Sequence, residues 1–322
     1  MSKKPILLLS RRLPHEVEER IAREYEARYN PYDRPFTQKE LLAAAGGADA
    51  LLVGPADELD AMFFELLPNS VRVIVTFSVG CDHIDVVAAR NRGIPIANTP
   101  GVLTDATADL TLLLILAASR RAYEGQNLVR SGEWNRSKSK SLLGVQLTGK
   151  ALGIYGMGRI GQAVAKRAKA FGMLIHYTNR SELPQEQSDG AVYHADPEEL
   201  LRASAFLSLH TPGTQITRHF LNSRTLALLP KGAIVINTSR GSLVKDQDLI
   251  AALKSGHIAA AGLDVFEGEP NVHEGYMSLP NVFLLPHLGS ATVETRTAMG
   301  MLALDNIAAV LSNSAAPTLV IG

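Results

Sequence analysis

The hexapeptide Gly156-Met157-Gly158-Arg159-Ile160-Gly161 constrains the fold of this chain more than any other feature. It follows an apolar run at residues 151–155 and precedes a segment, 160–171, whose apolar residues recur at helical spacing. Glycines at this spacing allow a sharp strand-to-helix turn, in which backbone N–H groups at the helix start approach a pyrophosphate closely. The spacing alone is weak evidence for a dinucleotide site, and a tight surface loop is the alternative interpretation. The flanking strand and helix favour a dinucleotide site.

The end of the next predicted strand indicates which dinucleotide binds. In NAD sites an acidic residue about 20 positions beyond the glycines accepts hydrogen bonds from the ribose 2′-OH. Here that position reads Asn179-Arg180-Ser181. A carboxylate would repel a 2′-phosphate, whereas a guanidinium can hold it with charge-assisted hydrogen bonds worth about 1.5–3 kcal/mol each. We therefore expect NADP(H) to be preferred over NAD(H), with a solvated loop arginine as the alternative.

Composition excludes several classes of protein. The 322 residues suffice for a large core and suggest two domains. The 32 Lys and Arg residues balance 32 Asp and Glu residues. The chain therefore has no excess positive charge of the kind that favours binding to nucleic acid or to an acidic membrane surface. The apolar runs at 6–9 and 110–118 are too short for a secretory signal or a membrane span. The single cysteine, Cys81, excludes an internal disulfide. From these features together we expect a soluble, cytoplasmic protein without nucleic-acid or membrane partners.

Short apolar runs alternate with helix-like segments along the whole chain, which predicts an α/β fold with two doubly wound parallel sheets. Helices are expected at 16–25, 84–91, 104–121, 127–134 and 292–311, and a Ser/Lys-rich connector at 135–144 is interpreted as a hinge or subunit-contact arm. Strands of the first sheet are expected at 6–9, 50–53, 71–77 and 94–97. The second sheet is expected to contain six strands, the number in a Rossmann sheet, at 151–155, 174–178, 206–209, 233–236, 259–263 and 282–285.

Three polar residues, Arg240, Glu269 and His287, follow consecutive strands of the second sheet. Open α/β sheets bind ligands at the carboxyl ends of their strands, so these side chains can converge there. Histidine can supply a proton near neutral pH, a neighbouring carboxylate favours the imidazolium, and arginine can bind a carboxylate and a developing oxyanion. This set suits hydride exchange at the carbonyl of a 2-oxo acid. Singly, each residue could instead be a packed, solvated or turn-capping side chain.

No metal is expected, because the nine histidines and the acidic residues show no zinc-type spacing.

Six segments together resemble the D-isomer-specific 2-hydroxyacid dehydrogenase family, and most closely its glyoxylate/hydroxypyruvate reductase branch. They occur in the family's order and span nearly the whole chain. The segments are Phe77-Ser78-Val79-Gly80-Cys81-Asp82-His83-Ile84-Asp85, Asn98-Thr99-Pro100-Gly101-Val102-Leu103-Thr104, the 156–161 hexapeptide, Asn237-Thr238-Ser239-Arg240-Gly241, Gly262-Leu263-Asp264-Val265-Phe266-Glu267-Gly268-Glu269-Pro270 and Pro286-His287-Leu288-Gly289-Ser290-Ala291-Thr292.

The resemblance implies roles for individual residues. His287 is the expected general acid/base, Glu269 its partner, and Arg240 the group that binds the substrate carboxylate and carbonyl. The expected substrate contacts are Leu52, Val53, Gly54, Ser78, Val79, Gly80, Arg240 and Trp134. Besides the hexapeptide and residues 179–181, the expected cofactor contacts are Thr104, His210, Thr211, Pro212, Thr238, Ser239, Arg240, Asp264, His287, Gly289 and Ser290. Trp134 resembles a residue of this branch that reaches from a partner subunit toward the substrate pocket. Burial of Trp134 in the dimer contact is the alternative.

The same resemblance implies the domain organisation and the activity. Residues 1–98 and 288–322 would form a smaller, flavodoxin-like substrate-binding domain, and residues 99–287 a dinucleotide-binding domain with a dimerisation arm at about 101–150. The expected protein is a homodimer that reduces glyoxylate or hydroxypyruvate to glycolate or D-glycerate with NADPH. Reduction of 2-ketogluconate or another 2-oxo acid is the nearest alternative. A dinucleotide-sensing corepressor is the alternative from another class.

Overall fold

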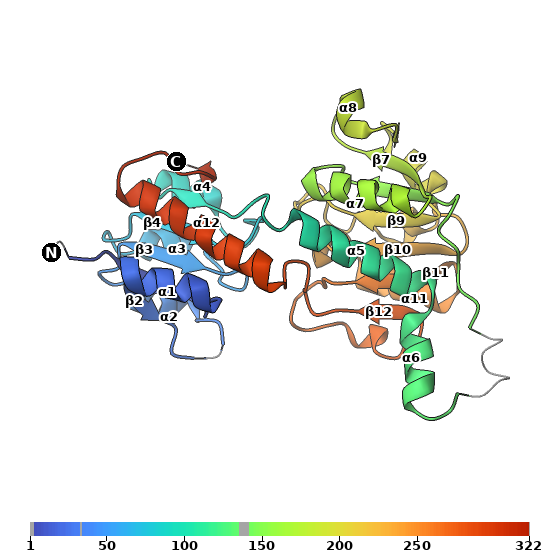
Figure 1. The fold of residues 1–322 in the computed structure, drawn as a ribbon, viewed down its shortest axis with the longest axis horizontal. Coiled ribbons are helices and arrows are strands. Elements are labelled where there is room, and N and C mark those ends of the chain that lie inside the picture. Colours follow the sequence, from blue (N-terminus) through green and yellow to red (C-terminus); the bar gives the residue numbers. More distant parts are fainter. Residues whose placement is uncertain (1–2, 33, 135–141, 322) are drawn as a thin grey trace. The chain divides into compact units, whose positions relative to one another are not determined.

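The computed structural model describes residues 3–32, 34–134 and 142–321, and the chain divides into two compact units (Figure 1). The first unit comprises Met1–Leu103 and Ala291–Gly322, and the second comprises Thr104–Ser290. Part of the predicted connector at 135–144 lies outside the described residues. In the described part of the chain, no helix is both long and apolar enough to cross a membrane.

The first unit is built on a six-stranded sheet in the order β13-β5-β4-β3-β1-β2. All neighbouring strands are parallel except β13 and β5. The strands are β1 Ile6–Leu9, β2 Glu26–Tyr29, β3 Ala50–Val53, β4 Val73–Thr76, β5 Ile96–Ala97 and β13 Leu319–Ile321. The helices are α1 His15–Glu24, α2 Gln38–Ala44, α3 Ala61–Leu66, α4 Val86–Asn91 and α12 Val293–Leu311.

The prediction of four strands for this sheet missed β2 and β13. Both lie at the edges of the sheet; no residue of β2 is fully buried, and Leu319 and Val320 of β13 are exposed. Edge strands do not need the continuous apolar run that a strand buried on both faces needs. β2 has the sequence EARY, which contains no apolar run from which a strand could be predicted. The central strands β1, β3 and β4 are buried at every position and were predicted within a few residues.

The second unit is built on a fully parallel seven-stranded sheet in the order β12-β11-β10-β9-β6-β7-β8. Its strands are β6 Ala151–Tyr155, β7 Leu174–Thr178, β8 Val192–Tyr193, β9 Phe206–Leu209, β10 Ala233–Asn237, β11 Ile258–Leu263 and β12 Val282–Leu284. Its α-helices are α5 Thr104–Ser119, α6 Ala122–Arg130, α7 Arg159–Ala170, α8 Gln185–Ser188, α9 Pro197–Ala203, α10 Ser223–Leu226 and α11 Asp246–Lys254. Two 3₁₀ turns, η2 Gly241–Leu243 and η3 Glu274–Tyr276, complete it.

Two predictions for this unit were wrong in detail. The sheet has a seventh strand, β8, which lies at the edge. It was not predicted because it is only two residues long, too short to form a recognisable apolar run. The helix expected at 127–134 is α6, which begins earlier and ends at Arg130. Gly132 stops it, because its φ of +72° lies in the left-handed region that ends helices.

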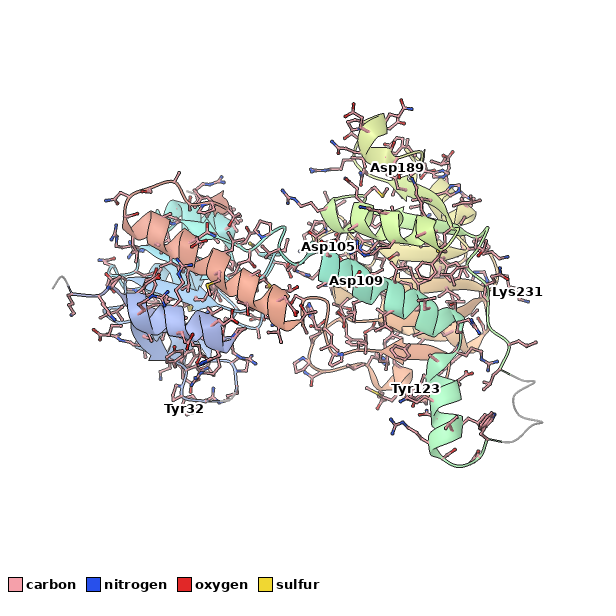
Figure 2. All side chains as sticks on the ribbon, viewed as in Figure 1. Tyr32, Asp105, Asp109, Tyr123, Asp189 and Lys231 are labelled. Atoms are coloured by element: carbon pink, nitrogen blue, oxygen red, sulfur yellow. The ribbon has the colours of Figure 1, made fainter. Side chains whose placement is uncertain are left out.

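Helices α5 and α7 pack together beside the sheet, and Arg167 of α7 forms two ion pairs with Asp105 and Asp109 of α5, the two aspartates labelled in Figure 2. Its Nη2 lies 2.8 Å from Asp105 Oδ1 and its Nε lies 2.5 Å from Asp109 Oδ1, both on α5. Apolar residues from the helices and strands form the core on each side of the sheet. A rigid parallel sheet therefore fixes the positions at which the loops leave its carboxyl edge.

Candidate active site

The glycine-rich turn lies between β6 and α7, where the expected dinucleotide site begins. Gly156 has a φ of +101°, and a Cβ atom there would lie 2.8 Å from the backbone carbon of His210. A Cβ on Gly161 would lie 2.4 Å from the oxygen of Gly156. Only glycine fits both positions, because a side chain at either would clash with neighbouring protein atoms, whereas a Cβ on Gly158 would meet nothing within 4 Å. The turn is therefore tight, and the start of α7 beside Gly158 is open to a ligand such as a pyrophosphate.

Asn179 and Arg180 follow β7 beside this turn. The Oδ1 atom of Asn179 accepts a hydrogen bond of 2.7 Å from the backbone N–H of Met157, which ties the strand end to the glycine-rich turn. Arg180 and Ser181 are exposed. Asn179 therefore has a structural contact in the turn, and Arg180 is accessible to a charged group.

His210 follows β9 with a neutral ring. Burial lowers the pKa of His210 to about 4, so the imidazole is uncharged at neutral pH. Its Nε2 lies 2.8 Å from the hydroxyl of Ser208. Other expected cofactor residues also meet here: the hydroxyl of Ser239 donates to the carbonyl of Thr211, and the buried hydroxyl of Thr238 lies 2.9 Å from that of Thr111 on α5.

Glu269 and His287 are in direct contact. His287 Nδ1 lies 2.7 Å from Glu269 Oε2, and the other carboxylate oxygen accepts the backbone N–H of Phe266 at 2.9 Å. Burial acts to raise the pKa of Glu269, but the hydrogen bond and charge of His287, the Phe266 N–H and the charge of Arg240 together hold it below its usual value. Glu269 is therefore a carboxylate at neutral pH, and it engages one of the two ring nitrogens of His287.

The backbone of His287 is held in an uncommon conformation. Its φ is +55°, in the left-handed region that non-glycine residues seldom occupy. Its N–H donates to the carbonyl of Asp264 at 2.9 Å, and the Asp264 carboxylate accepts the N–H groups of Leu288 and Gly289 at 2.7 and 2.8 Å. Burial raises the pKa of this fully buried carboxyl, although the two N–H groups oppose the rise. Asp264, expected as a cofactor contact, thus holds the loop that presents His287.

Arg240 leaves β10 beside these groups. Residue pairs Asn237–Leu263 and Leu263–Leu284 are in register, so the segments carrying Arg240, Asp264 and His287 leave neighbouring strands. The Asn237 side chain donates to the Arg240 carbonyl at 2.8 Å, and Arg240 Nη1 donates to the Ser239 carbonyl at 2.7 Å. The strand ends therefore bring the three candidate catalytic residues to one edge of the sheet.

In the first unit, the expected substrate loop at 78–80 is held through its carbonyl groups. The Ser78 hydroxyl donates to the Gly80 carbonyl at 2.7 Å and lies 2.7 Å from the Thr76 hydroxyl. The Asn98 side chain donates to the Val79 carbonyl at 2.7 Å, a supporting role not predicted from the sequence although Asn98 begins one of the matching segments. With these carbonyls occupied, the loop is suited to binding an anion through its N–H groups.

Leu52 and Val53 end β3, Gly54 follows it, and all three line a cavity of about 200 Å³ in the same unit. Phe77 and Arg296 also line it, and the Arg296 guanidinium lies over the Phe77 ring, 5.8 Å from its centroid. Burial and the nearby charge of Arg11 lower the pKa of Arg296. This end of the first sheet therefore offers a positively charged hollow beside the expected substrate residues.

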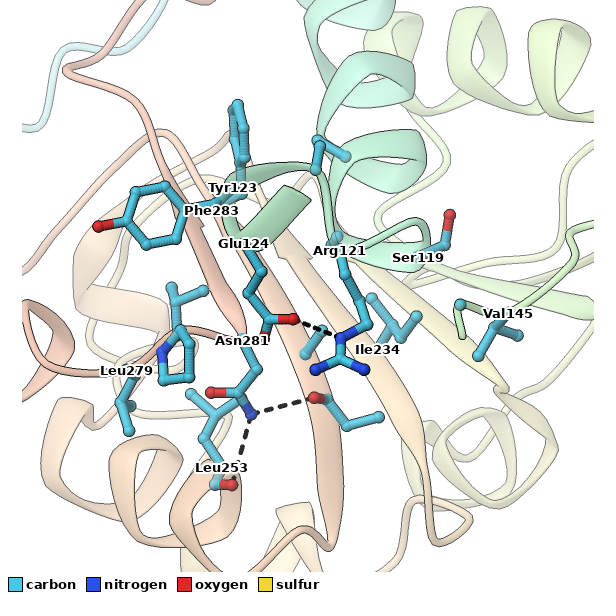
Figure 3. A pocket seen from close by; sticks show the side chains of 18 of the residues that line it. Ser119, Arg121, Tyr123, Glu124, Val145, Ile234, Leu253, Leu279, Asn281 and Phe283 are labelled. Carbon is cyan, nitrogen blue, oxygen red and sulfur yellow. Dashed lines mark hydrogen bonds and ion pairs between the residues drawn. The ribbon is translucent and has the colours of Figure 1, made fainter. Parts of the chain in front are cut away.

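Trp134 lies beyond the end of α6 and is 64% exposed. A second, open cavity of about 580 Å³ lies near α6, at the amino ends of β10, β11 and β12 (Figure 3). Arg121, Glu124 and Phe283 are among the residues that line it, and Arg121 Nε lies 2.5 Å from Glu124 Oε2. It lies at the sheet edge opposite to that of His287.

No group of histidine, cysteine and acidic side chains that could hold a metal ion occurs within residues 3–32, 34–134 and 142–321.

Comparison with known proteins identifies relatives over the whole chain. Residues 112–289 match the family model described as D-isomer specific 2-hydroxyacid dehydrogenase, NAD binding domain. The chain is 42% identical over 316 residues to a glycerate dehydrogenase of Hyphomicrobium methylovorum, covering 98% of each protein. It is 44% identical over 321 residues to a glyoxylate reductase of Thermococcus litoralis, covering 98% of this chain and 97% of that protein.

Solved structures agree with these matches. A putative D-isomer specific 2-hydroxyacid dehydrogenase from Polaromonas superimposes with a TM-score of 0.93 at 43% identity, covering 99% of this chain and all of that one. An NADPH-dependent glyoxylate/hydroxypyruvate reductase from Sinorhizobium meliloti, solved with NADP and malonate, superimposes with a TM-score of 0.89 at 36% identity, covering 99% and 97%. The predicted α/β fold with two parallel-sheet domains is therefore confirmed.

Proposed function

The chain belongs to the D-isomer-specific 2-hydroxyacid dehydrogenase family, and from this premise we propose that it reduces glyoxylate or hydroxypyruvate with NADPH. The products are glycolate or D-glycerate. The observation that carries the proposal is the 2.7 Å contact between His287 Nδ1 and Glu269, because it engages one ring nitrogen and leaves Nε2 to deliver the proton.

In the proposed reaction each residue has a separate task. His287 donates a proton to the carbonyl oxygen of the substrate, and Glu269 stabilises the imidazolium before transfer. Arg240 binds the substrate carboxylate and the developing charge on the oxygen. When bound at the glycine-rich turn, the nicotinamide cofactor supplies the hydride. Backbone N–H groups at Val79 and Gly80 hold the substrate carboxylate.

Steady-state assays of NADPH and NADH against a panel of 2-oxo acids test this proposal. We expect the highest kcat/KM for NADPH with glyoxylate or hydroxypyruvate, and loss of turnover in the His287→Gln variant with cofactor binding retained. A wild type that binds cofactor but turns over no 2-oxo acid would contradict the proposal and favour a sensing role.

The preference for NADPH rests on the residues that follow β7. No carboxylate stands at 179–181, and the exposed Arg180 can pair with a 2′-phosphate. The glycine-rich turn fits a dinucleotide pyrophosphate, because Gly156 and Gly161 permit the tight strand-to-helix turn and no side chain at Gly158 covers the start of α7. The solved relative from Sinorhizobium meliloti, which binds NADP, supports the proposal.

A longer substrate such as 2-ketogluconate is a second candidate. The cavity of about 200 Å³ beside Leu52–Gly54 offers room beyond what a two-carbon acid requires. If kcat/KM for 2-ketogluconate exceeds that for both glyoxylate and hydroxypyruvate, this candidate replaces the first.

We also propose that the protein is a homodimer formed through the 101–150 arm. Trp134, Val129 and Leu143 of this arm are 64%, 60% and 80% exposed, an apolar surface suited to a second copy. The cavity near α6 adds an apolar hollow in the same region. Light scattering should give twice the chain mass of 34.6 kDa, and the variant Val129→Asp should shift the protein toward monomer. A wild-type monomer at micromolar concentration would contradict the proposal.

A further inference from the structure

Glu267 lies in the loop that carries Glu269, yet the proposed reaction gives it no task. We propose that Glu267 is a positioning residue: by binding Arg218 and His219, it holds the 264–270 loop in the conformation in which Glu269 meets His287. The inference rests on the proposed function, because it explains how the proposed catalytic groups are kept in place.

Both carboxylate oxygens of Glu267 have a partner. Oε1 lies 2.5 Å from Arg218 Nη2, and Oε2 lies 2.9 Å from His219 Nε2. The side chains of Glu267 and His219 are each 30% exposed, so the contact is partly shielded from water. Two bonds from one carboxylate to adjacent residues fix its direction as well as its distance.

Glu267 and Glu269 stand on either side of Gly268, whose φ is +79°. Their carboxylates bind different partners, since Glu269 contacts His287 while Glu267 contacts Arg218 and His219. Two carboxylates this close in one loop would compete for the same cation if both were free to move. Separate partners prevent that competition and leave His287 to Glu269.

The 218–221 segment, which Glu267 binds through Arg218 and His219, is itself hydrogen-bonded to the 241–243 segment that follows Arg240. His219 has a φ of +50°, and its N–H donates to the Ser242 carbonyl at 2.8 Å. The N–H of Leu221 donates to the Leu243 carbonyl at 3.0 Å. Residues 219–221 therefore form a short ladder with the 3₁₀ turn that begins directly after Arg240.

The 264–270 loop also touches the Arg240 segment directly. A Cβ on Gly241 would lie 1.8 Å from the backbone carbon of Phe266, so the two backbones are in close contact. Phe266 in turn donates its N–H to Glu269. The three segments thus form a closed ring of contacts, and Glu267 closes it with a side chain.

The primary test compares Glu267→Ala and Glu267→Gln in the intact enzyme. Losing hydrogen bonds to charged groups should lower kcat about tenfold in Glu267→Ala, with the KM for the 2-oxo acid and the Kd for NADPH changed less than about twofold. Glu267→Gln should stay within about threefold of wild type, because the amide oxygen can still accept from Arg218. Glu274→Ala, which removes an exposed glutamate of the same unit, is the matched control and should match wild type.

A second variant keeps the test decisive if Glu267→Ala folds poorly. Arg218→Met changes a side chain that is 51% exposed, and should lower kcat about threefold. If the two residues act together, the double variant should be no slower than Glu267→Ala alone. Wild-type kcat in Glu267→Ala or in Arg218→Met, no recovery in Glu267→Gln, or losses that multiply in the double variant would each overturn the inference.

Amide hydrogen exchange separates this inference from the proposed function. The Phe266 N–H should exchange faster in Glu267→Ala than in wild type, whatever the substrate. If the wild type reduced no 2-oxo acid, the proposed function would fail while this measurement would still decide the inference. Equal exchange in both proteins would overturn it.

Discussion

Both units contain a mainly parallel sheet, but the carboxyl ends of the strands carry different chemistry in the two sheets. In the second unit the strand ends carry a charged set, Arg240, Glu269 and His287, in which the carboxylate and imidazole are 2.7 Å apart. In the first unit the 78–80 loop is held by the neutral groups of Ser78 and Asn98. The comparison shows that function follows from the side chains placed at the strand ends, since both sheets are mainly parallel. We expect changes at the charged set of the second unit to affect kcat, and changes at the 78–80 loop of the first unit to affect KM.

Replacing His287 should have the largest effect. His287→Gln removes the proposed proton donor and should lower kcat by about 10²–10⁴-fold. NADPH binding, measured by fluorescence titration, should be retained. His257→Gln is the control, because His257 Nε2 lies 3.0 Å from the Leu226 carbonyl in the same unit. A His287→Gln enzyme with more than a tenth of wild-type kcat would remove the distinction between the two units.

Glu269→Gln should rank second, with kcat lowered about 10–100-fold, because an amide stabilises the imidazolium less than a carboxylate. The pKa of Glu269 is held below its usual 4.5, so the charge is present at neutral pH and is lost only as the pH falls through that lower value. The difference between wild type and variant should therefore be full at pH 7 and shrink below pH 4.5 in a pH–rate profile. A constant ratio down to the lowest accessible pH would contradict this sign.

Arg180→Ala should change cofactor choice by about tenfold, measured as the NADPH to NADH ratio of kcat/KM, since one charge-assisted bond is lost. Lys231→Ala is the control, because the exposed Lys231 precedes β10 at the opposite, amino edge of the same sheet (Figure 2). An unchanged ratio would show that another group binds the 2′-phosphate.

The smallest effect is expected at the 78–80 loop of the first unit. Ser78→Ala loses the bond to the Gly80 carbonyl and should raise the KM for the 2-oxo acid about fivefold with little change in kcat. Ser70→Ala serves as control, because the buried Ser70 hydroxyl has no hydrogen-bond partner among the described residues. A fall in kcat as large as that of Glu269→Gln would erase the proposed division between the two units.

The sequence predicted the family and the α/β fold, and both are confirmed. It also located Arg240, Glu269 and His287 beyond three strands, because buried parallel strands read as apolar runs with clear ends. It did not predict the edge strands, because β2 has the largely polar sequence EARY and β8 and β13 are only two and three residues long.

Contacts that depend on loop packing were also beyond the sequence. Nothing in the pattern around Asp264 indicates that its carboxylate accepts two N–H groups of the His287 loop. Likewise, 48 residues separate Glu267 from His219, and only the packing of β9, β10 and β11 brings them together.

The most direct test of the central claim is transfer of label from NADPH deuterated at the reactive C4 position. With hydroxypyruvate as substrate, the wild type should yield D-glycerate carrying deuterium at C2, identified by chiral chromatography and mass spectrometry, and His287→Gln should yield almost none. Unlabelled product, the L isomer, or equal labelling by the variant would contradict the account.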